Sequence, residues 1–108
     1  MYLVPSYTDK MPDEAENNGL TDEELDMYGY VSSSKRRVAV ITTLKDNPIT
    51  PKQIAESTEI RLNHVSNVLS ELAEESLVNC VNPTRKRGRV YKVTKTGGKV
   101  AEKLIRNE

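Results

Sequence analysis

Hydrophobic and polar positions recur with helical spacing over most of residues 35–105, and this pattern predicts a mainly helical domain. The core-facing positions repeat at intervals of three and four residues, at 37, 40, 41 and 44, at 65, 68, 69 and 72, and at 100, 101, 104 and 105. This spacing gathers side chains on one face of an α-helix. We expect one helix opened by residues 32–34 and stopped at Pro48, a second over residues 62–75, and a last one capped by Thr94.

Two further helix starts are indicated by capping boxes, in which a Thr is followed three residues later by Glu or Gln. Thr50 precedes Gln53, and Pro51 lies between them at the first helical position, where proline is favoured. The sequence predicts a helix of about two turns here, ending near residue 58. The pair Thr21 and Glu24 likewise predicts a short helix over residues 22–28, closed by Gly29.

Residues 77–81 and 90–93 alternate between apolar and polar positions, which predicts two short strands. Between them lies a basic loop that contains Arg85, Lys86, Arg87 and Arg89. We expect Pro83 to end the first strand and Gly88 to permit the tight return. The expected order of helix, short helix, turn, helix and hairpin is that of a winged helix-turn-helix. Ala55 would lie where the two paired helices cross, and Ile60 would fill the corner between them.

Charge is distributed unevenly, although the formal net charge of the 108 residues is zero. Residues 1–30 hold one cation and eight acids, whereas residues 31–108 hold 15 cations and eight acids. We expect an acidic, largely flexible arm over residues 1–29 and a basic domain over residues 30–108. Such asymmetry indicates contact with nucleic acid or another anionic surface. The arm is either solubilising or an internal competitor for the basic surface.

The segment over residues 50–99 resembles the winged-helix DNA-binding domains of prokaryotic transcriptional regulators, especially the small archaeal regulators related to the MarR and ArsR groups. The resemblance covers roughly residues 30–104. It depends on the order of several short motifs: Ile54-Ala55, then Val65-Ser66 with Leu69 and Leu72, then Leu77-Val78, and finally Gly88-Arg89 with Tyr91, Thr94 and Gly97. The family usually has glycine where this chain has Glu59 and Ser76, in corners that favour a left-handed backbone.

The resemblance implies that the helix over residues 62–75 enters the major groove of double-stranded DNA, where base edges present a distinct pattern of donors and acceptors. Its exposed N-terminal half would carry the DNA-binding residues Arg61, Asn63, His64, Ser66 and Asn67, of which Ser66 would donate to a phosphate. The loop cations Arg85, Lys86, Arg87 and Arg89 would lie along the backbone or in the minor groove. Ser32, Ser33 and Thr50 would donate to phosphates.

Alternative interpretations of these residues remain open. The loop cations also fit a solvated loop or a targeting tag, and the stripe on the last helix fits either the core or a homodimer seam. His64 is the only histidine and Cys80 the only cysteine, so neither has a partner at metal-ligand spacing. Cys80 fits a small core residue or a redox sensor, and a lone thiol is typical of a reducing cytoplasm.

Enzymatic function has little support, because the sequence has no phosphate-binding glycine loop and no nucleophile–base arrangement. It also has no apolar run long enough for a membrane span and no secretory signal pattern. We expect a cytoplasmic, nucleoid-associated, homodimeric transcriptional regulator that binds specific double-stranded DNA sequences and needs no cofactor or metal. The alternatives are a winged-helix protein-interaction module and a non-specific chromatin- or RNA-binding protein.

Overall fold

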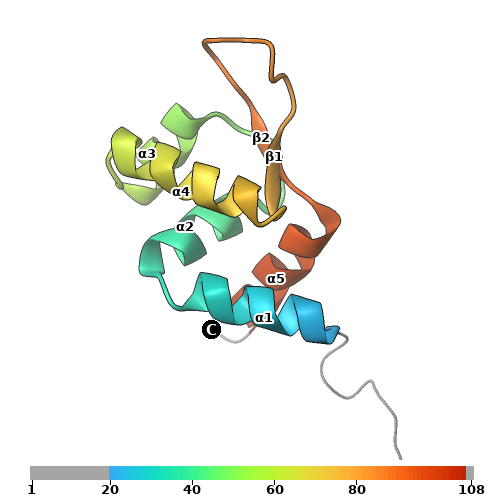
Figure 1. Cartoon of the computed structure of the whole chain (residues 1–108). Coiled ribbons are helices and arrows are strands. Elements are labelled where there is room, and N and C mark those ends of the chain that lie inside the picture. Colours follow the sequence, from blue (N-terminus) through green and yellow to red (C-terminus); the bar gives the residue numbers. More distant parts are fainter. Residues whose placement is uncertain (1–19, 107–108) are drawn as a thin grey trace, which may run out of the picture.

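The computed structural model describes residues 20–106, and within them helices surround the base of a two-stranded hairpin (Figure 1). In chain order the elements are α1 (Asp22–Ser32), α2 (Lys35–Leu44), α3 (Pro51–Thr58), α4 (Leu62–Glu74), β1 (Val78–Cys80), β2 (Tyr91–Val93) and α5 (Lys95–Arg106). The predicted fold class, mainly helical with a small hairpin, is confirmed. Residues 1–19, which form most of the predicted acidic arm, lie outside the described residues.

Helices α1, α3 and α5 begin where the sequence places capping residues, whereas α4 begins after Arg61 without a side-chain cap. The Thr21 hydroxyl accepts from the Glu24 amide at 3.1 Å, and the Thr50 hydroxyl accepts from the Gln53 amide at 3.1 Å. Both are complete capping boxes, because each acidic or amide side chain also accepts from the backbone N–H of its threonine. These contacts satisfy amides that have no partner within the helix. The predicted cap of the last helix is confirmed too, since Gly97 donates its amide to the Thr94 hydroxyl at 3.0 Å.

Two predicted helix boundaries were wrong. α1 does not stop at Gly29 but continues to Ser32, because Val31 is fully buried in the core and holds the last turn in place. Consequently α2 is not opened by the three serines together. Ser32 and Ser33 belong to the end of α1, and Ser34 alone caps α2 by accepting from the Arg37 amide at 3.3 Å.

The hairpin is antiparallel, with Val78 paired to Val93, Asn79 to Lys92 and Cys80 to Tyr91. Tyr91 also exchanges backbone hydrogen bonds with Ile49, at 2.9 and 3.1 Å, so the segment before α3 pairs with the outer edge of β2. The strands are shorter than predicted: β1 ends at Cys80, well before Pro83, and β2 begins at Tyr91. Beyond them the ladder contributes one more hydrogen bond, from the Val81 amide to the Val90 carbonyl at 2.7 Å.

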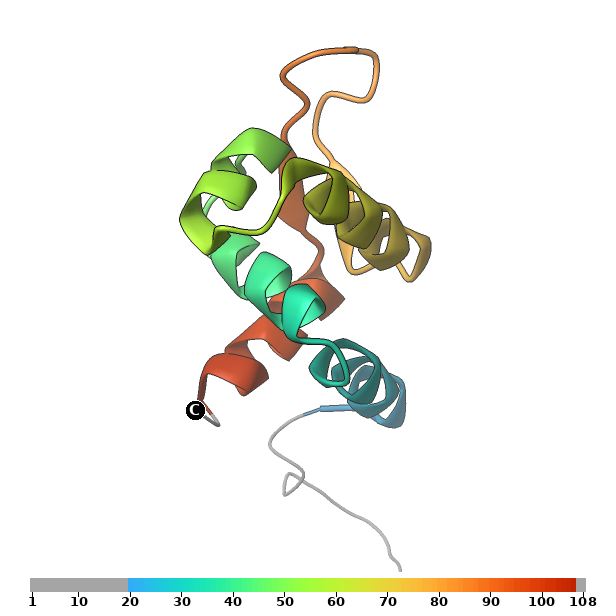
Figure 2. The same cartoon turned by 90° about the vertical axis from the view of Figure 1, so that its left-hand side faces the viewer.

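One apolar core joins all the helices to the hairpin. It contains the predicted stripe of α4 and residues from every other helix: Val31, Val40, Ile41, Leu44, Ile54, Val65, Val68, Leu69, Leu72, Leu77, Val78, Val100, Ala101 and Leu104. The loop between the strands projects away from this core (Figures 1 and 2). It lies at the end of the molecule opposite the last turn of α5.

Helix α1 packs on α5 and is linked to it by an ion pair between the nearly buried Glu24 and the partly exposed Lys99. The Lys99 ammonium lies 3.4 Å from Oε2 of Glu24, whose other oxygen accepts from the Thr21 amide at 2.9 Å. The hydrogen bond from the Thr21 backbone and the charge of Lys99 hold the pKa of Glu24 below its ordinary value, against the opposing effect of burial. Glu24 therefore serves both as a helix cap and as a link between α1 and α5.

The carbonyl of Leu77 lies at the junction of α4, the hairpin and α5. It accepts from both the amide and the hydroxyl of Thr94, at 3.0 and 3.2 Å. A Cβ atom added to Gly97 would lie 1.9 Å from the same oxygen, so only glycine allows the first turn of α5 to come this close. Ser76, just before Leu77, has φ of 62°, which makes the left-handed corner expected at this position.

We expect Gly97→Ala to lower the free energy of unfolding by ~2 kcal/mol or more, because the backbone of Leu77 must move to admit the methyl group. Urea denaturation followed by circular dichroism measures this change. The matched control is Gly29→Ala, since a Cβ there meets nothing within 4 Å and the residue lies inside α1.

Alanine costs less backbone entropy than glycine in a helix, so Gly29→Ala should raise the free energy of unfolding by ~0.5–1 kcal/mol. Equal effects of the two substitutions would contradict the close approach of α5 to Leu77.

Candidate nucleic-acid interface

Helices α3 and α4 form a compact pair joined by a corner at residues 59–61. Glu59 ends α3 with φ of 63°. This is the left-handed conformation expected at this position, where the resembling family usually has glycine. Ile60 packs partly buried against the core, as predicted for the corner between the helices. A left-handed residue other than glycine costs about 1 kcal/mol, and here the residue also carries an exposed negative charge.

Helix α4 separates its apolar and polar residues, except that Leu62 at its first position is exposed. Val65, Val68, Leu69 and Leu72 are buried, so the opposite side of the helix faces solvent. Among the predicted residues, Arg61, Asn63, Ser66 and Asn67 are exposed on that side, and His64 is half-buried. Ser70 follows Ser66 and Asn67 by one helical turn and is exposed with them, although the sequence interpretation omitted it.

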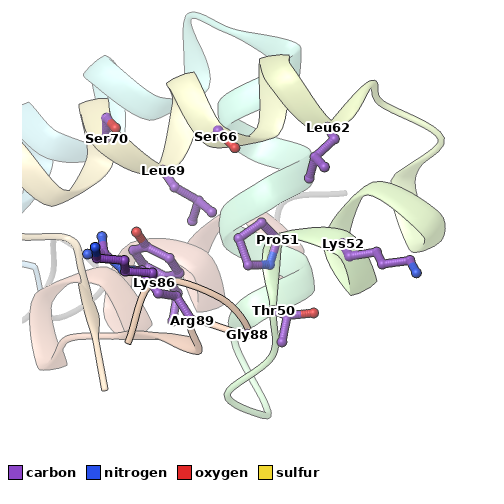
Figure 3. A pocket seen from close by; sticks show the side chains of 11 residues that line it. Thr50, Pro51, Lys52, Leu62, Ser66, Leu69, Ser70, Lys86, Gly88 and Arg89 are labelled. Carbon is purple, nitrogen blue, oxygen red and sulfur yellow. The ribbon is translucent and has the colours of Figure 1, made fainter. Parts of the chain in front are cut away.

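A groove of about 630 Å³ lies between α4, the start of α3 and the hairpin loop, and we call it the wing groove (Figure 3). Leu62 and Leu69 point into it from α4 toward Pro51 and the loop. Its walls come from three segments of the chain and comprise Thr50, Pro51, Lys52, Leu62, Ser66, Leu69, Ser70, Lys86, Gly88, Arg89 and Tyr91. Of the predicted residues, Thr50, Ser66, Lys86 and Arg89 thus meet at one place. The walls of the groove do not include the others in α4 and the loop, which are Arg61, Asn63, His64, Asn67, Arg85 and Arg87.

The loop of the hairpin, residues 81–90, is the wing, and its four cations are all exposed. Two of them bond within the wing itself. Arg89 donates from Nε to the Arg85 carbonyl at 2.6 Å and from Nη2 to the Pro83 carbonyl at 3.2 Å, while Arg85 donates from Nε to the Arg87 carbonyl at 3.2 Å. In residues 20–106, neither Lys86 nor Arg87 has a side-chain hydrogen bond or ion pair.

The three residues predicted to contact phosphates from outside α4 do not lie together. Thr50 lines the wing groove, where its hydroxyl caps α3. Ser32 and Ser33 lie instead at the corner between α1 and α2, and their hydroxyls donate to the carbonyls of Gly29 and Tyr30, at 3.3 and 2.8 Å. Lys52, an exposed cation in the first turn of α3, lines the groove and was missed. Its place in the first turn of a helix whose start borders the groove is the signal that could have identified Lys52.

Arg37 links three helices. Its position in the stripe predicted for α2 did not indicate this role. Its Nε lies 3.2 Å from Oε1 of Glu71 on α4, and its Nη1 donates to the Tyr30 carbonyl at 3.1 Å. The guanidinium also lies 4.0 Å from the centre of the Tyr30 ring, within the range of a cation–π contact. The side of α4 away from the wing groove is therefore fixed to the ends of α1 and α2.

Within the described part of the chain, no group of three or more His, Cys, Asp or Glu side chains is placed to hold a metal ion. Cys80 is a free, half-buried thiol in β1, 3.5 Å from Oδ1 of Asn82. Of the helices in residues 20–106, none combines the length and apolar character needed to cross a membrane.

Searches for similar proteins give a match only at the level of structure. No protein-family model matches the chain, and no curated protein matches it. The solved structures include a mutant of ZitR from Lactococcus lactis, with a TM-score of 0.61 and 23% identity over 68% of this chain and 51% of that chain. The chain therefore spans about half the length of ZitR.

Two other solved structures are also similar to this chain. The MarR family transcriptional regulator SPO1453 from Silicibacter pomeroyi has a TM-score of 0.62 and 14% identity, over 80% of this chain and 64% of that chain. Mb0332 from Mycobacterium bovis, a homodimeric winged helix-turn-helix DNA-binding domain and possible ArsR-family regulator, has a TM-score of 0.57 and 22% identity, over 82% and 84% of the two chains. The fold of this chain is a winged helix-turn-helix. Its structural neighbours are MarR-family and ArsR-family regulators, and at these identities the likeness establishes the fold alone.

We expect Arg37→Met to lower the free energy of unfolding by ~1–2 kcal/mol, because it removes the hydrogen bond to Tyr30, the ring contact and a partly screened ion pair. The matched control is Arg36→Met, at the neighbouring exposed position, which should change the stability by less than ~0.5 kcal/mol. Urea denaturation of both variants measures the difference, and similar losses at the two positions would show that Arg37 does not hold the helices together.

Proposed function

We propose that this protein is a transcriptional regulator that binds specific sequences in double-stranded DNA. The observation that carries the proposal is the wing groove. Three segments separate in sequence border this one feature: Ser66 and Ser70 from the polar side of α4, the start of α3, and Lys86 and Arg89 from the cationic wing. A helix with a polar exposed side is suited to the major groove, and adjacent cations are suited to the phosphate backbone.

In the proposed complex, α4 lies in the major groove with Asn63 and Asn67 facing the base edges. Asparagine can form two hydrogen bonds with adenine, and Arg61 at the start of the helix can bridge a guanine. Ser66 and Thr50 border the groove and have hydroxyls that suit phosphate oxygens. His64 is half-buried at the edge of this surface, where it would contact the backbone.

The wing supplies positive charge next to α4. Lys86 and Arg89 line the groove and Arg87 is exposed on the same loop, so the wing suits the backbone or the adjacent minor groove. Binding that depends on such cations releases counterions from DNA and weakens steeply as the salt concentration rises. The exposed Glu59 opposes this attraction at the corner between α3 and α4.

We further propose that the protein acts as a homodimer. The structural similarity to Mb0332, which is described as homodimeric, supports this state. Leu25 on α1 and Ile105 on α5 also support it, because both are large apolar residues exposed on the surface. Two copies related by a two-fold axis would place two α4 helices on successive turns of a symmetric DNA site.

The test is a selection of bound sequences from random duplexes, followed by competition between the selected site and random DNA. Enrichment of one motif and a strong preference in the competition support the proposal. Equal binding to all duplexes would replace it with non-specific nucleic-acid binding. A complete lack of salt-dependent binding would favour a protein-interaction module.

Two classes of substitution should have different effects on DNA binding. Asn67→Ala or Asn63→Ala should reduce discrimination between the selected and random sites, because each removes a reader of base edges. Arg87→Ala should weaken binding to every sequence and reduce the slope of log K against log salt by about one. Fluorescence anisotropy titrations over a range of salt concentrations measure both quantities.

The matched control is Arg106→Ala, which removes an exposed cation from the last turn of α5, at the opposite end of the molecule from the wing (Figures 1 and 2). Its affinity and salt slope should equal those of the unaltered protein. An effect of Arg106→Ala as large as that of Arg87→Ala would move the interface away from the wing.

A further inference from the structure

The four cations of the wing belong to two structural classes. The guanidinium of Arg89 reaches back across the loop to two carbonyls, those of Pro83 and Arg85. Arg85 reaches forward to the Arg87 carbonyl. Lys86 and Arg87 lie between these two arginines in the loop, and their side chains have no hydrogen bond or ion pair within residues 20–106. Sequence alone does not distinguish these classes, because all four residues are cations in one short run.

Asn82 closes the base of the same loop. Its Nδ2 donates to the Gly88 carbonyl at 3.2 Å, and its Oδ1 accepts from the Val90 amide at 2.8 Å. The Asn82 carbonyl accepts from the Arg85 amide at 3.1 Å. The side-chain amide thus bridges the two arms just beyond the last hydrogen bond of the ladder, where a longer strand would otherwise be needed.

Gly88 completes this arrangement. Its φ of 66° lies in the left-handed region, and its carbonyl is the one that Asn82 holds. The loop is therefore bridged at its base by Asn82 and across its middle by Arg89. A solvated basic loop has no need of such bridges, whereas a binding loop gains from them, because a loop already in its bound shape loses less conformational entropy on binding.

We propose that Asn82 and Arg89 are positioning residues that give the wing its shape, and that Lys86 and Arg87 are the wing residues that contact DNA directly. This inference deepens the proposed function and rests on it. It also changes the predicted site, in which the four cations were equivalent and Asn82 was absent.

The experiment compares four variants of the full chain by two measurements. The first is the order parameter of the backbone amides of residues 84–89 in the free protein, from ¹⁵N relaxation, which needs no DNA. The second is the affinity for duplex DNA at several salt concentrations. The variants are Asn82→Ala, which leaves the charge unchanged, Arg89→Lys and Arg87→Lys, which keep the charge, and Arg87→Ala.

Asn82→Ala and Arg89→Lys should lower the order parameters of the loop and weaken DNA binding about 3- to 10-fold, because each loses net hydrogen bonds that hold the wing. Lysine cannot reproduce the fork by which arginine reaches two carbonyls. Arg87→Lys should leave the loop ordered and the affinity within about 2-fold, since a phosphate contact requires mainly the charge. Arg87→Ala should also leave the loop ordered but lower the affinity and the salt slope.

Each other outcome has a distinct meaning. If Asn82→Ala leaves the loop as ordered as before, the bridging role of Asn82 is wrong, whether or not the protein binds DNA. If Arg89→Lys weakens binding while the loop stays ordered, Arg89 contacts DNA directly and the division into two classes is overturned. If the unaltered protein binds no duplex at low salt, the proposed function fails, and the order parameters still decide the structural part.

Discussion

The backbone contact between Leu77 and the first turn of α5 is the constraint on which the rest of the structure depends. The Leu77 carbonyl accepts from the amide and the hydroxyl of Thr94, and Gly97 leaves room for this oxygen. The Leu77 amide also donates a hydrogen bond to the Leu72 carbonyl of α4 at 2.9 Å. One small region therefore fixes the end of α4, the base of the hairpin and the start of α5 relative to one another. The orientation of the wing beside α4 follows from it.

The polar side of α4 is held from both of its flanks. On one flank, the buried residues of α4 share the apolar core with Val78 of β1, and this packing fixes α4 beside the hairpin. On the other, Arg37 connects Glu71 to the Tyr30 ring and carbonyl, so α4 is also joined to the end of α1. Because α1 packs on α5 through Glu24 and Lys99, an interaction made by α1 or α5 has a continuous route of contacts to α4. Rigid support of this kind suits a helix whose side chains must meet a partner in fixed positions.

The sequence predicted those features that depend on neighbouring residues. The caps at Thr21, Thr50 and Thr94, and the polar side of α4, follow from patterns a few residues long, so they could be identified. The left-handed corners at Glu59 and Ser76 could be located from family resemblance, and both have positive φ. The misses involve contacts between distant residues. Arg37 bonds Glu71, which lies 34 positions later in the chain. Val31 extends α1 because it is buried in the core, which residues of the other helices form. Asn82 lies beyond the last hydrogen bond of the ladder, and its side chain bonds the backbone of Gly88 and Val90 on the returning arm. No local pattern encodes such pairs.

The most direct test of the central claim, that α4 and the wing together form a DNA interface, is to map backbone amide chemical shifts during titration with a duplex enriched by selection. We expect the largest changes on the exposed residues of α4, the first turn of α3 and residues 85–89, while the last turn of α5 stays unchanged. Changes concentrated on α1 and α5, or no change with any duplex at low salt, would contradict it.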